Sequence, residues 1–258
     1  MGNRQIAVLL LPLLWLLPAH LSMALEIQSK SDAINVAGKQ RMYTMRMLRD
    51  HLMMGEHLTY KKPDADLKKT VAAFDEASAA LESYLKDPDL QSDMAMIQKQ
   101  WRSVRTMFDT PPKKEEALVN AKSVIAFREQ LNTFVNHMAK KYGGGSAQVI
   151  NHAGRLRAVS QALAAAYLLK SWGVSGANDK LVVPMKHFRE SLDILDKAKE
   201  TVSSMRPILT RLERTYLFFE VMDDADTTTT PVLAIKKTDK MLKDADALTK
   251  MYVEALKR

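Results

Sequence analysis

A stretch of nine residues occurs twice in this chain, and the repetition constrains the fold more than any other feature. Residues 34–42 read Ile-Asn-Val-Ala-Gly-Lys-Gln-Arg-Met, and residues 150–158 read Ile-Asn-His-Ala-Gly-Arg-Leu-Arg-Ala. Isoleucine, asparagine, alanine, glycine and the arginine at positions 41 and 157 recur at the same places of the two copies. Each copy opens a segment with helical periodicity. Internal duplication is the simplest account, and it predicts two similar modules in tandem.

The remainder of each half follows the same plan of four helical segments. Apolar residues at three- and four-residue steps predict helices over 31–60, 65–86, 88–108 and 114–140, and then over 145–172, 179–203, 207–223 and 232–256. Prolines and glycines break the pattern between them. Phe74 and Tyr142 of the first half have counterparts in Phe188 and Tyr252. Each half is therefore predicted to be a four-helix bundle.

The composition agrees with an all-α fold. Hydrophobic residues make up 47% of the 258 residues, and Ala, Leu, Lys, Glu and Met outweigh the strand-forming residues. We predict two modules, residues 25–144 and 145–258, which meet at the glycines 143–145. A bent helix that passes through these glycines is the alternative.

Residues 1–24 resemble a secretory signal peptide. Arg4 supplies the positive start, residues 6–17 the apolar run, and Ser22-Met23-Ala24 the small-x-small cleavage site. The alternative is an uncleaved membrane anchor, but the apolar run is short for a span and Pro12 interrupts it. A cleaved signal predicts a periplasmic protein.

Several functions are not expected. The chain has no cysteine, and its six histidines form no His-x-x-x-His pair. With no nucleophile elbow, phosphate loop or paired catalytic carboxylates in recognisable context, we predict no enzyme, no catalytic residue, no cofactor and no metal site. The net charge of +8 is spread along the helices, and export argues against a nucleic-acid partner.

Copper binding is one alternative. Met47, His51 and Met54 fall on roughly one helix face, and this soft set of ligands suits Cu(I). Methionines more often fill gaps in a hydrophobic core. The acidic residues at 223–226 lack the spacing of a calcium loop and indicate a polar turn.

The repeated arginines lie where apolar residues are expected. Arg41 shares a helical face with Ile34, Met45 and Leu48, and Arg157 occupies the same place in the second copy. Burying a guanidinium without a partner lowers the stability of the fold by an amount on the order of several kcal/mol. A buried arginine therefore requires an anionic partner.

A glycine stands one turn before each arginine. Gly38 and Gly154 would let the two helices approach closely, and the arginines would then converge. A small planar oxyanion between the two forked guanidiniums would relieve their repulsion. Thr44 and Ser160, three residues after each arginine, could add hydroxyl donors. Gly38, Arg41, Thr44, Gly154, Arg157 and Ser160 are therefore the predicted ligand-binding residues.

Three structural explanations of the arginines remain open. Each arginine could pair with a carboxylate of its own bundle, such as Asp75, Glu76 or Glu190. It could extend past its apolar neighbours to the surface. The glycines could also serve packing alone.

At these residues the chain resembles a known family. Ile-Asn-x-Ala-Gly-x-x-Arg-Met, followed by Arg46, is similar to the box of NarX-like and PilJ-like bacterial sensory domains. The resemblance implies periplasmic four-helix bundles of nitrate/nitrite sensor kinases and type IV pilus chemoreceptors. In the nitrate-sensing members the anion lies between two such boxes across a dimer interface. The resemblance nominates Gly38 and Arg41, with Gly154 and Arg157 in the second copy.

The second copy departs from the box at two positions. Ala158 replaces the methionine, and Ala162 stands where Arg46 would recur. Asn35 and Asn151 match the box without an obvious contact role. No kinase or methyl-accepting segment is recognisable after the second copy.

The favoured hypothesis is a periplasmic sensory or binding protein for nitrate or nitrite that signals through a partner. A membrane receptor, a sensor kinase or a pilus component would suit that role, and a homodimer is another way to pair two boxes. A helical envelope adaptor without a ligand is the second hypothesis, and copper binding is the third.

Overall fold

The computed structural model describes residues 25–177, 182–224 and 230–256. An all-α fold is confirmed over these ranges, in which every regular element is a helix. The helices are α1 (Lys30–Gly55), α2 (Pro63–Tyr84), α3 (Pro88–Arg105), η1 (Thr106–Asp109), α4 (Lys114–Ser171), α5 (Val182–Lys197), η3 (Ser203–Met205), α6 (Arg206–Asp224) and α7 (Pro231–Ala255). The predicted signal peptide, residues 1–24, lies outside the described residues, as does part of the acidic turn after Asp224.

Helix α1 begins at a side-chain cap and is unusually buried. The Ser29 hydroxyl accepts a hydrogen bond from the backbone N–H of Asp32 at 3.1 Å, which satisfies one free donor of the first turn. The helix ends at Gly55, five residues before the predicted end at Tyr60. The chain turns away there because His57, Lys61 and Lys62 take up positive φ angles, which a continuing helix does not allow.

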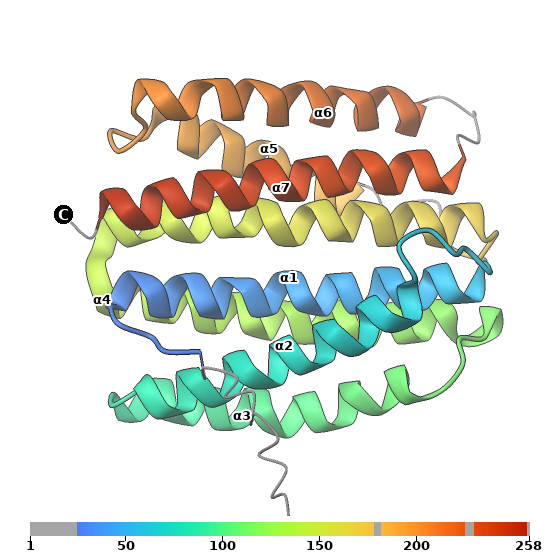
Figure 1. Cartoon of the computed structure of the whole chain (residues 1–258), viewed down its shortest axis with the longest axis horizontal. Helices are drawn as coiled ribbons and strands as arrows, with labels where there is room; N and C mark the ends of the chain where they lie inside the picture. Colours follow the sequence, from blue (N-terminus) through green and yellow to red (C-terminus); the bar gives the residue numbers. More distant parts are fainter. Residues whose placement is uncertain (1–24, 178–181, 225–229, 257–258) are drawn as a thin grey trace, which may run out of the picture.

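Helices α1, α2, α3 and the first arm of α4, residues 114–143, pack together as the first bundle (Figure 1). Proline starts both α2 and α3, and the Asp87 carboxylate caps α3 by accepting from the N–H groups of Asp89 and Leu90. Aromatic rings fill the core, where the centroids of Phe74 and Trp101 lie 4.2 Å apart.

Helix α4 reverses direction at the glycines 143–145. Gly144 leaves the helical region, with φ 57° and ψ −132°, so α4 consists of two helical arms joined at a kink. The two arms meet at the glycines where the sequence predicted the break between helices. A single residue turns the chain because this backbone conformation is accessible to glycine and almost closed to other residues.

Gly144→Ala is expected to destabilise the protein by about 1–3 kcal/mol, the cost of holding a side-chain-bearing residue in this region. Gly143→Ala is the comparison variant, because Gly143 has no positive φ and the added Cβ would require only a small shift of Ala147, whose Cβ would lie 3.3 Å away. Urea unfolding, monitored by circular dichroism, measures the free energy of unfolding of both variants. Equal stabilities for the two variants would contradict this account of the bend.

The second arm of α4, residues 145–171, packs with α5, α6 and α7 as the second bundle (Figure 1). Helix α5 ends at Lys197 rather than at the predicted residue 203. The reason is a polar anchor, since the Thr201 hydroxyl hydrogen bonds to both the Leu195 carbonyl and the Tyr252 hydroxyl. The chain then forms the short helix η3 before α6 begins.

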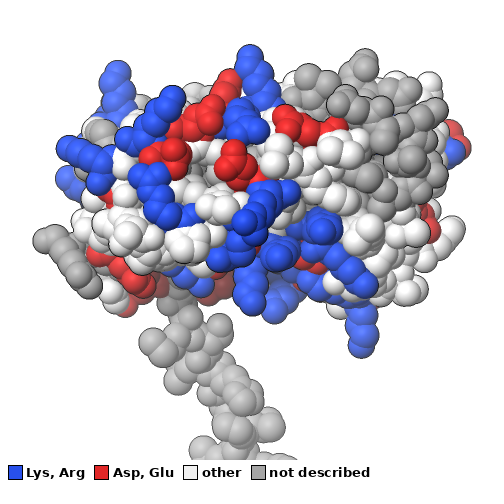
Figure 2. Space-filling model, turned by 90° about the horizontal axis from the view of Figure 1, so that it is seen from above, with Lys and Arg blue, Asp and Glu red and all other residues white. Residues whose placement is uncertain are grey.

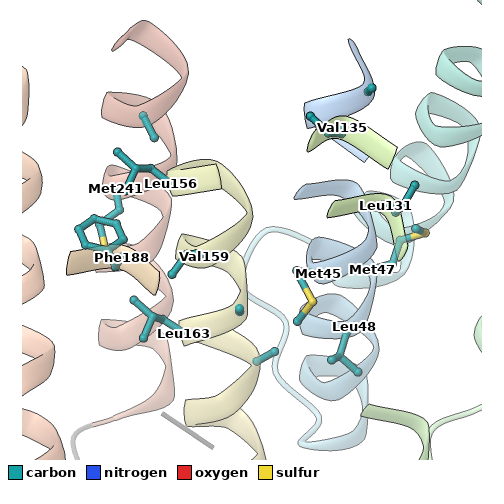
Figure 3. Close-up of a cluster of buried hydrophobic side chains, with 14 of the residues drawn as sticks. Met45, Met47, Leu48, Leu131, Val135, Leu156, Val159, Leu163, Phe188 and Met241 are labelled. Atoms are coloured by element: carbon teal, nitrogen blue, oxygen red, sulfur yellow. The ribbon is translucent and has the colours of Figure 1, made fainter. Parts of the chain in front are cut away.

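The two bundles meet along α1 and the second arm of α4, which run side by side in the same direction (Figure 1). Figure 3 shows part of the hydrophobic core, which is one continuous cluster that includes both bundles. Its part in the first bundle contains Met45, Met47, Leu48, Leu131 and Val135, and its part in the second bundle contains Leu156, Val159, Leu163, Phe188 and Met241. The central helices are thus buried on the bundle side and again on the side where they face each other.

The outer surface is polar. Figure 2 shows lysines and arginines interspersed with acidic side chains on the face seen from above α6. Across the described ranges, no helix combines the length and apolar character that a membrane span requires.

Candidate functional site

The two repeated boxes meet at their glycines, where α1 crosses the second arm of α4. A Cβ atom placed on Gly38 would lie 3.2 Å from Nη2 of Arg157 and 3.4 Å from Nη2 of Arg41. A Cβ on Gly154 would lie 3.2 and 3.3 Å from the same two atoms. The missing side chains therefore make room for the ends of both arginines, which converge between the helices.

Each arginine is held by the asparagine of the other box. Arg41 Nη1 donates to Asn151 Oδ1 at 2.8 Å, and its Nη2 donates to the Asn151 carbonyl at 3.1 Å. Arg157 repeats this pattern on Asn35, with 2.9 Å to Oδ1 and 3.3 Å to the carbonyl. Sequence reasoning found no contact for these asparagines, although their recurrence in both copies was the available signal.

Part of each guanidinium remains unused. A guanidinium has five N–H donors, and three of them are engaged on Arg41 and three on Arg157. The Nε atoms of both arginines have no hydrogen-bond partner, and each Nη2 retains one free hydrogen. The Nε–Nη2 edge is the side-on fork with which arginine binds an oxyanion through two hydrogen bonds.

The two arginines differ in how their charges are balanced. Nη1 of Arg157 lies 3.3 Å from the Asp246 carboxylate of α7. In the corresponding place, Nη1 of Arg41 donates a hydrogen bond to the neutral amide oxygen of Asn132, on the first arm of α4. Both side chains are buried, at 0–1% exposed. Burial, followed by the charges of Arg155, Arg157 and Arg128, lowers the pKa of Arg41 well below its ordinary value. The charged form of Arg41 is the less well compensated of the two.

The structure also decides among the structural explanations of the arginines. Neither side chain reaches the surface, and the carboxylate beside Arg157 is Asp246 rather than Glu190. Asp75 instead accepts hydrogen bonds from Trp101 and Arg105. Pairing with a carboxylate of its own bundle therefore applies to Arg157, and its partner, Asp246, was not among the carboxylates named as examples.

The predicted hydroxyl donors lie in the buried layer beside the arginines. The Thr44 hydroxyl donates to the Gln40 carbonyl at 2.8 Å, and the Ser160 hydroxyl donates to the Arg157 carbonyl at 2.7 Å. Both hydroxyl hydrogens are thus engaged by their own helices. To contact a ligand, either hydroxyl would have to rotate.

A second buried ionic cluster was missed by the sequence reasoning. Arg49, which is 1% exposed, binds three carboxylates from three helices. Its guanidinium lies 2.6 Å from Asp50, 3.0 Å from Asp66 of α2 and 2.9 Å from Asp239 of α7. It also donates to Gln161 of α4 at 2.7 Å. Arg49 therefore ties α1 to both bundles at once.

Within this cluster Asp50 is the group most affected by burial. Its side chain is inaccessible to solvent, and its Oδ2 atom has no hydrogen-bond partner. Burial raises the pKa of Asp50 to about 7, against the opposing charge of Arg49. Burial also acts to raise the pKa of Asp66, but hydrogen bonds and charge from Arg46 outweigh it and hold that pKa below its usual value.

Asp50 should make the protein less stable as the pH rises from about 4 to 7. Its pKa is higher in the folded state than in the unfolded chain, so the folded state holds an extra proton in this window, and stability falls by about 1.4 kcal/mol per pH unit. Asp50→Asn mimics the protonated carboxyl and should remove this slope.

Urea unfolding of both proteins at pH 5, 6, 7 and 8 measures the effect. The difference between the two curves isolates Asp50, because the histidines titrate alike in both proteins. A difference that does not change with pH would show that Asp50 is ionised throughout.

The methionine and histidine set on α1 takes part in packing. Met47 is fully buried in the first core. His51 Nε2 lies 3.0 Å from the Thr110 carbonyl, and the ring packs edge-on against Phe108. Among the described residues, no group of three or more His, Asp or Glu side chains is arranged to hold a metal ion.

Comparison with known proteins identifies one matching family. Residues 25–131 match the model described as type IV pili methyl-accepting chemotaxis transducer N-terminal, abbreviated PilJ. The match covers α1, α2, α3 and part of the first arm of α4, and therefore includes the first box but not the second. No curated protein and no solved structure matches the chain.

Proposed function

We propose that the protein, whose residues 25–131 match the PilJ N-terminal domain model, is a sensory protein that binds a small oxyanion at the arginine pair. The ligand class is a planar monoanion of the size of nitrate or nitrite. Arg41 and Arg157 would bind it through their free Nε–Nη2 edges, with Gly38 and Gly154 leaving room between the helices for the ends of the two guanidiniums.

The observation that carries the proposal is the convergence of two buried guanidiniums at a pair of glycines. Both keep the same two donors unused, and Arg41 receives no carboxylate of its own. A bound anion would supply both the missing charge and the missing acceptors. An oxyanion suits the site because its oxygens can accept from two forks at once.

The duplicated architecture suggests how binding could be read out. We propose that residues 25–144 and 145–258 are tandem modules, so that one chain supplies the two boxes that a homodimer would otherwise supply. An anion at their interface would stabilise one relative placement of the bundles. The protein would act in the periplasm and transmit that placement to a membrane receptor, a sensor kinase or a pilus component.

A second function is favoured by the asparagines. Because Asn35 and Asn151 already accept hydrogen bonds from the arginines, the pair can also serve as a structural clamp between the bundles. The protein would then be a helical adaptor that binds its partner without a small ligand. This alternative predicts that neither nitrate nor nitrite changes the stability of the protein.

Thermal unfolding of residues 25–258 in nitrate, nitrite or chloride at equal ionic strength tests the proposal. A ligand at 100 times its dissociation constant should add about 2.7 kcal/mol of stability, which raises the unfolding midpoint by several degrees. Unchanged midpoints in nitrate and nitrite relative to chloride would favour the adaptor.

Arg41→Lys is the informative variant. It keeps the positive charge but loses the fork, and it should lose the nitrate response while remaining folded. Arg105→Lys is the matched control, because that side chain is 49% exposed and pairs only with Asp75 at the surface. A nitrate response that survives in Arg41→Lys would exclude the arginine pair as the site. A shift with Cu(I) alone would support the copper hypothesis.

A further inference from the structure

A small cationic cleft lies beside Arg41, and Arg157 is not among the residues that line it. It is lined by Arg41 of α1, by Arg128, Glu129 and Asn132 of the first arm of α4, by Arg155 of the second arm, and by His187 of α5. The cavity has a volume of about 10 Å³. It therefore has room for about one water molecule as it stands.

The charges around this cleft do not balance. Three guanidiniums face one carboxylate, that of Glu129, which pairs with Arg128. Arg155 has no ion pair and no hydrogen bond to its Nε among the described residues. The nearby carboxylate of Glu190 is engaged by Lys186 at 4.0 Å. Arg41 and Arg155 thus leave about two positive charges without a direct anionic partner.

The donors are also unsatisfied, and the Nε atoms of all three guanidiniums are shielded from solvent, although Arg155 and His187 as whole residues are only half-buried. Arg128 is 7% exposed. Among the described residues, neither its Nε atom nor that of Arg41 has a hydrogen-bond partner. Burial lowers the pKa of Arg155, and the charge of Glu129 opposes this shift only in part. The pKa of His187 is lowered by burial and then by Arg128, so the ring is a neutral donor at pH 7. The cleft offers donors and positive charge without an acceptor to match.

Glu129 lies at the mouth of the cleft. Its side chain is 45% exposed, so it can turn into solvent at little cost, and its carboxylate is the sole anion among the residues that line the cavity. It therefore occupies the place that an external anion would take. Displacing it would both enlarge the cleft and free the Arg128 guanidinium.

We propose that this cleft is a site for an inorganic tetrahedral dianion, such as sulfate or phosphate, which displaces the Glu129 carboxylate and binds Arg128, Arg155 and Arg41. A dianion matches the two uncompensated charges, whereas a monoanion such as nitrate matches one. The size of the cleft favours a free inorganic ion over a phosphate carried on an organic group. The cleft shares Arg41 with the arginine pair, so Arg128 and Arg155 are the ligands that distinguish it.

Titration calorimetry of residues 25–258 with sodium sulfate and with sodium phosphate, against sodium chloride at equal ionic strength, tests the site. Arg155→Gln should weaken dianion binding about tenfold or more, since it removes a charged donor. Glu129→Gln should strengthen it by about tenfold, since it removes the competing carboxylate. Arg157→Lys is the matched control and should leave dianion binding unchanged. A phosphomonoester that binds as tightly as phosphate would show that the organic group is accommodated, against the inference of an inorganic ligand.

The outcomes separate this site from the arginine pair of the boxes. Sulfate binding that is lost in Arg155→Gln and kept in Arg157→Lys supports the cleft, even if nitrate has no effect. Sulfate binding that survives in Arg155→Gln, or that is absent from both the wild type and Glu129→Gln, overturns it. Circular dichroism of each variant confirms that a lost response is not a lost fold, and Arg155 suits this test because it has no ion pair to lose.

Discussion

Arg49→Met is expected to lower the free energy of unfolding by about 3–5 kcal/mol, the usual cost of removing one partner from a buried ionic cluster. Methionine retains most of the volume of the side chain but leaves Asp50, Asp66 and Asp239 without the cation that they share. Because the three carboxylates come from helices of both bundles, the loss should fall on the contact between the bundles. Urea unfolding at pH 7.5 measures it.

Two further variants make this prediction specific. Arg46→Met removes an arginine that binds the same Asp66 carboxylate from the same helix, but its side chain is 28% exposed, so the cost should be below about 1 kcal/mol. Adding Asp50→Asn to Arg49→Met should restore part of the lost stability, because it removes one of the stranded carboxylates. Equal costs for the two arginines would mean that solvent reaches the Arg49 cluster.

Phe74→Ala and Phe188→Ala should each destabilise the protein by about 3–5 kcal/mol, the range found when a buried phenylalanine is truncated to alanine. The two rings occupy equivalent places in the duplicated plan and are fully buried. Phe74 packs against Trp101 and Phe127, and Phe188 stacks on Tyr216 with the ring centroids 5.7 Å apart. Each variant therefore opens a cavity in one bundle only.

The pair also tests whether the bundles unfold together. In residues 25–258 carrying Trp172→Phe, Trp101 is the single tryptophan and its fluorescence reports on the first bundle. Far-ultraviolet circular dichroism reports on the helices of both bundles. Because α1 and the second arm of α4 are buried against each other, Phe188→Ala should shift both signals to the same lower midpoint. A Trp101 transition that keeps its wild-type midpoint would show that the two modules fold independently.

The helical plan followed from the sequence, since it depends on local periodicity. The apolar stripe of α1 is buried as its three- and four-residue spacing predicts, from Ile34 to Leu52. The duplication of Gly-x-x-Arg left open whether the two helices meet at Gly38 and Gly154, and the structure brings them together there. A glycine one turn before an arginine can be read from the sequence itself. Its missing side chain is what allows another helix to approach closely.

The partners of those arginines could not be derived in the same way. Asn132 lies 91 residues from Arg41, and Asp246 lies 89 residues from Arg157. Which of several polar residues on a packed helix faces a given arginine depends on the rotation and axial shift of that helix. The sequence has no periodic signal for either quantity, so it offered Glu190 as one possible partner where the structure has Asp246.

What the sequence determined alone is therefore the set of helices, the duplication and the need of two buried arginines for polar partners. The tertiary structure decided that each arginine takes the asparagine of the other box, and that Arg157 has a carboxylate where Arg41 has an amide. It also decided that Arg49 joins the two bundles and that Arg128 and Arg155 open onto one cleft. The physical reason is that hydrophobic burial is set by spacing along one helix, whereas charge compensation is set by how separate helices dock.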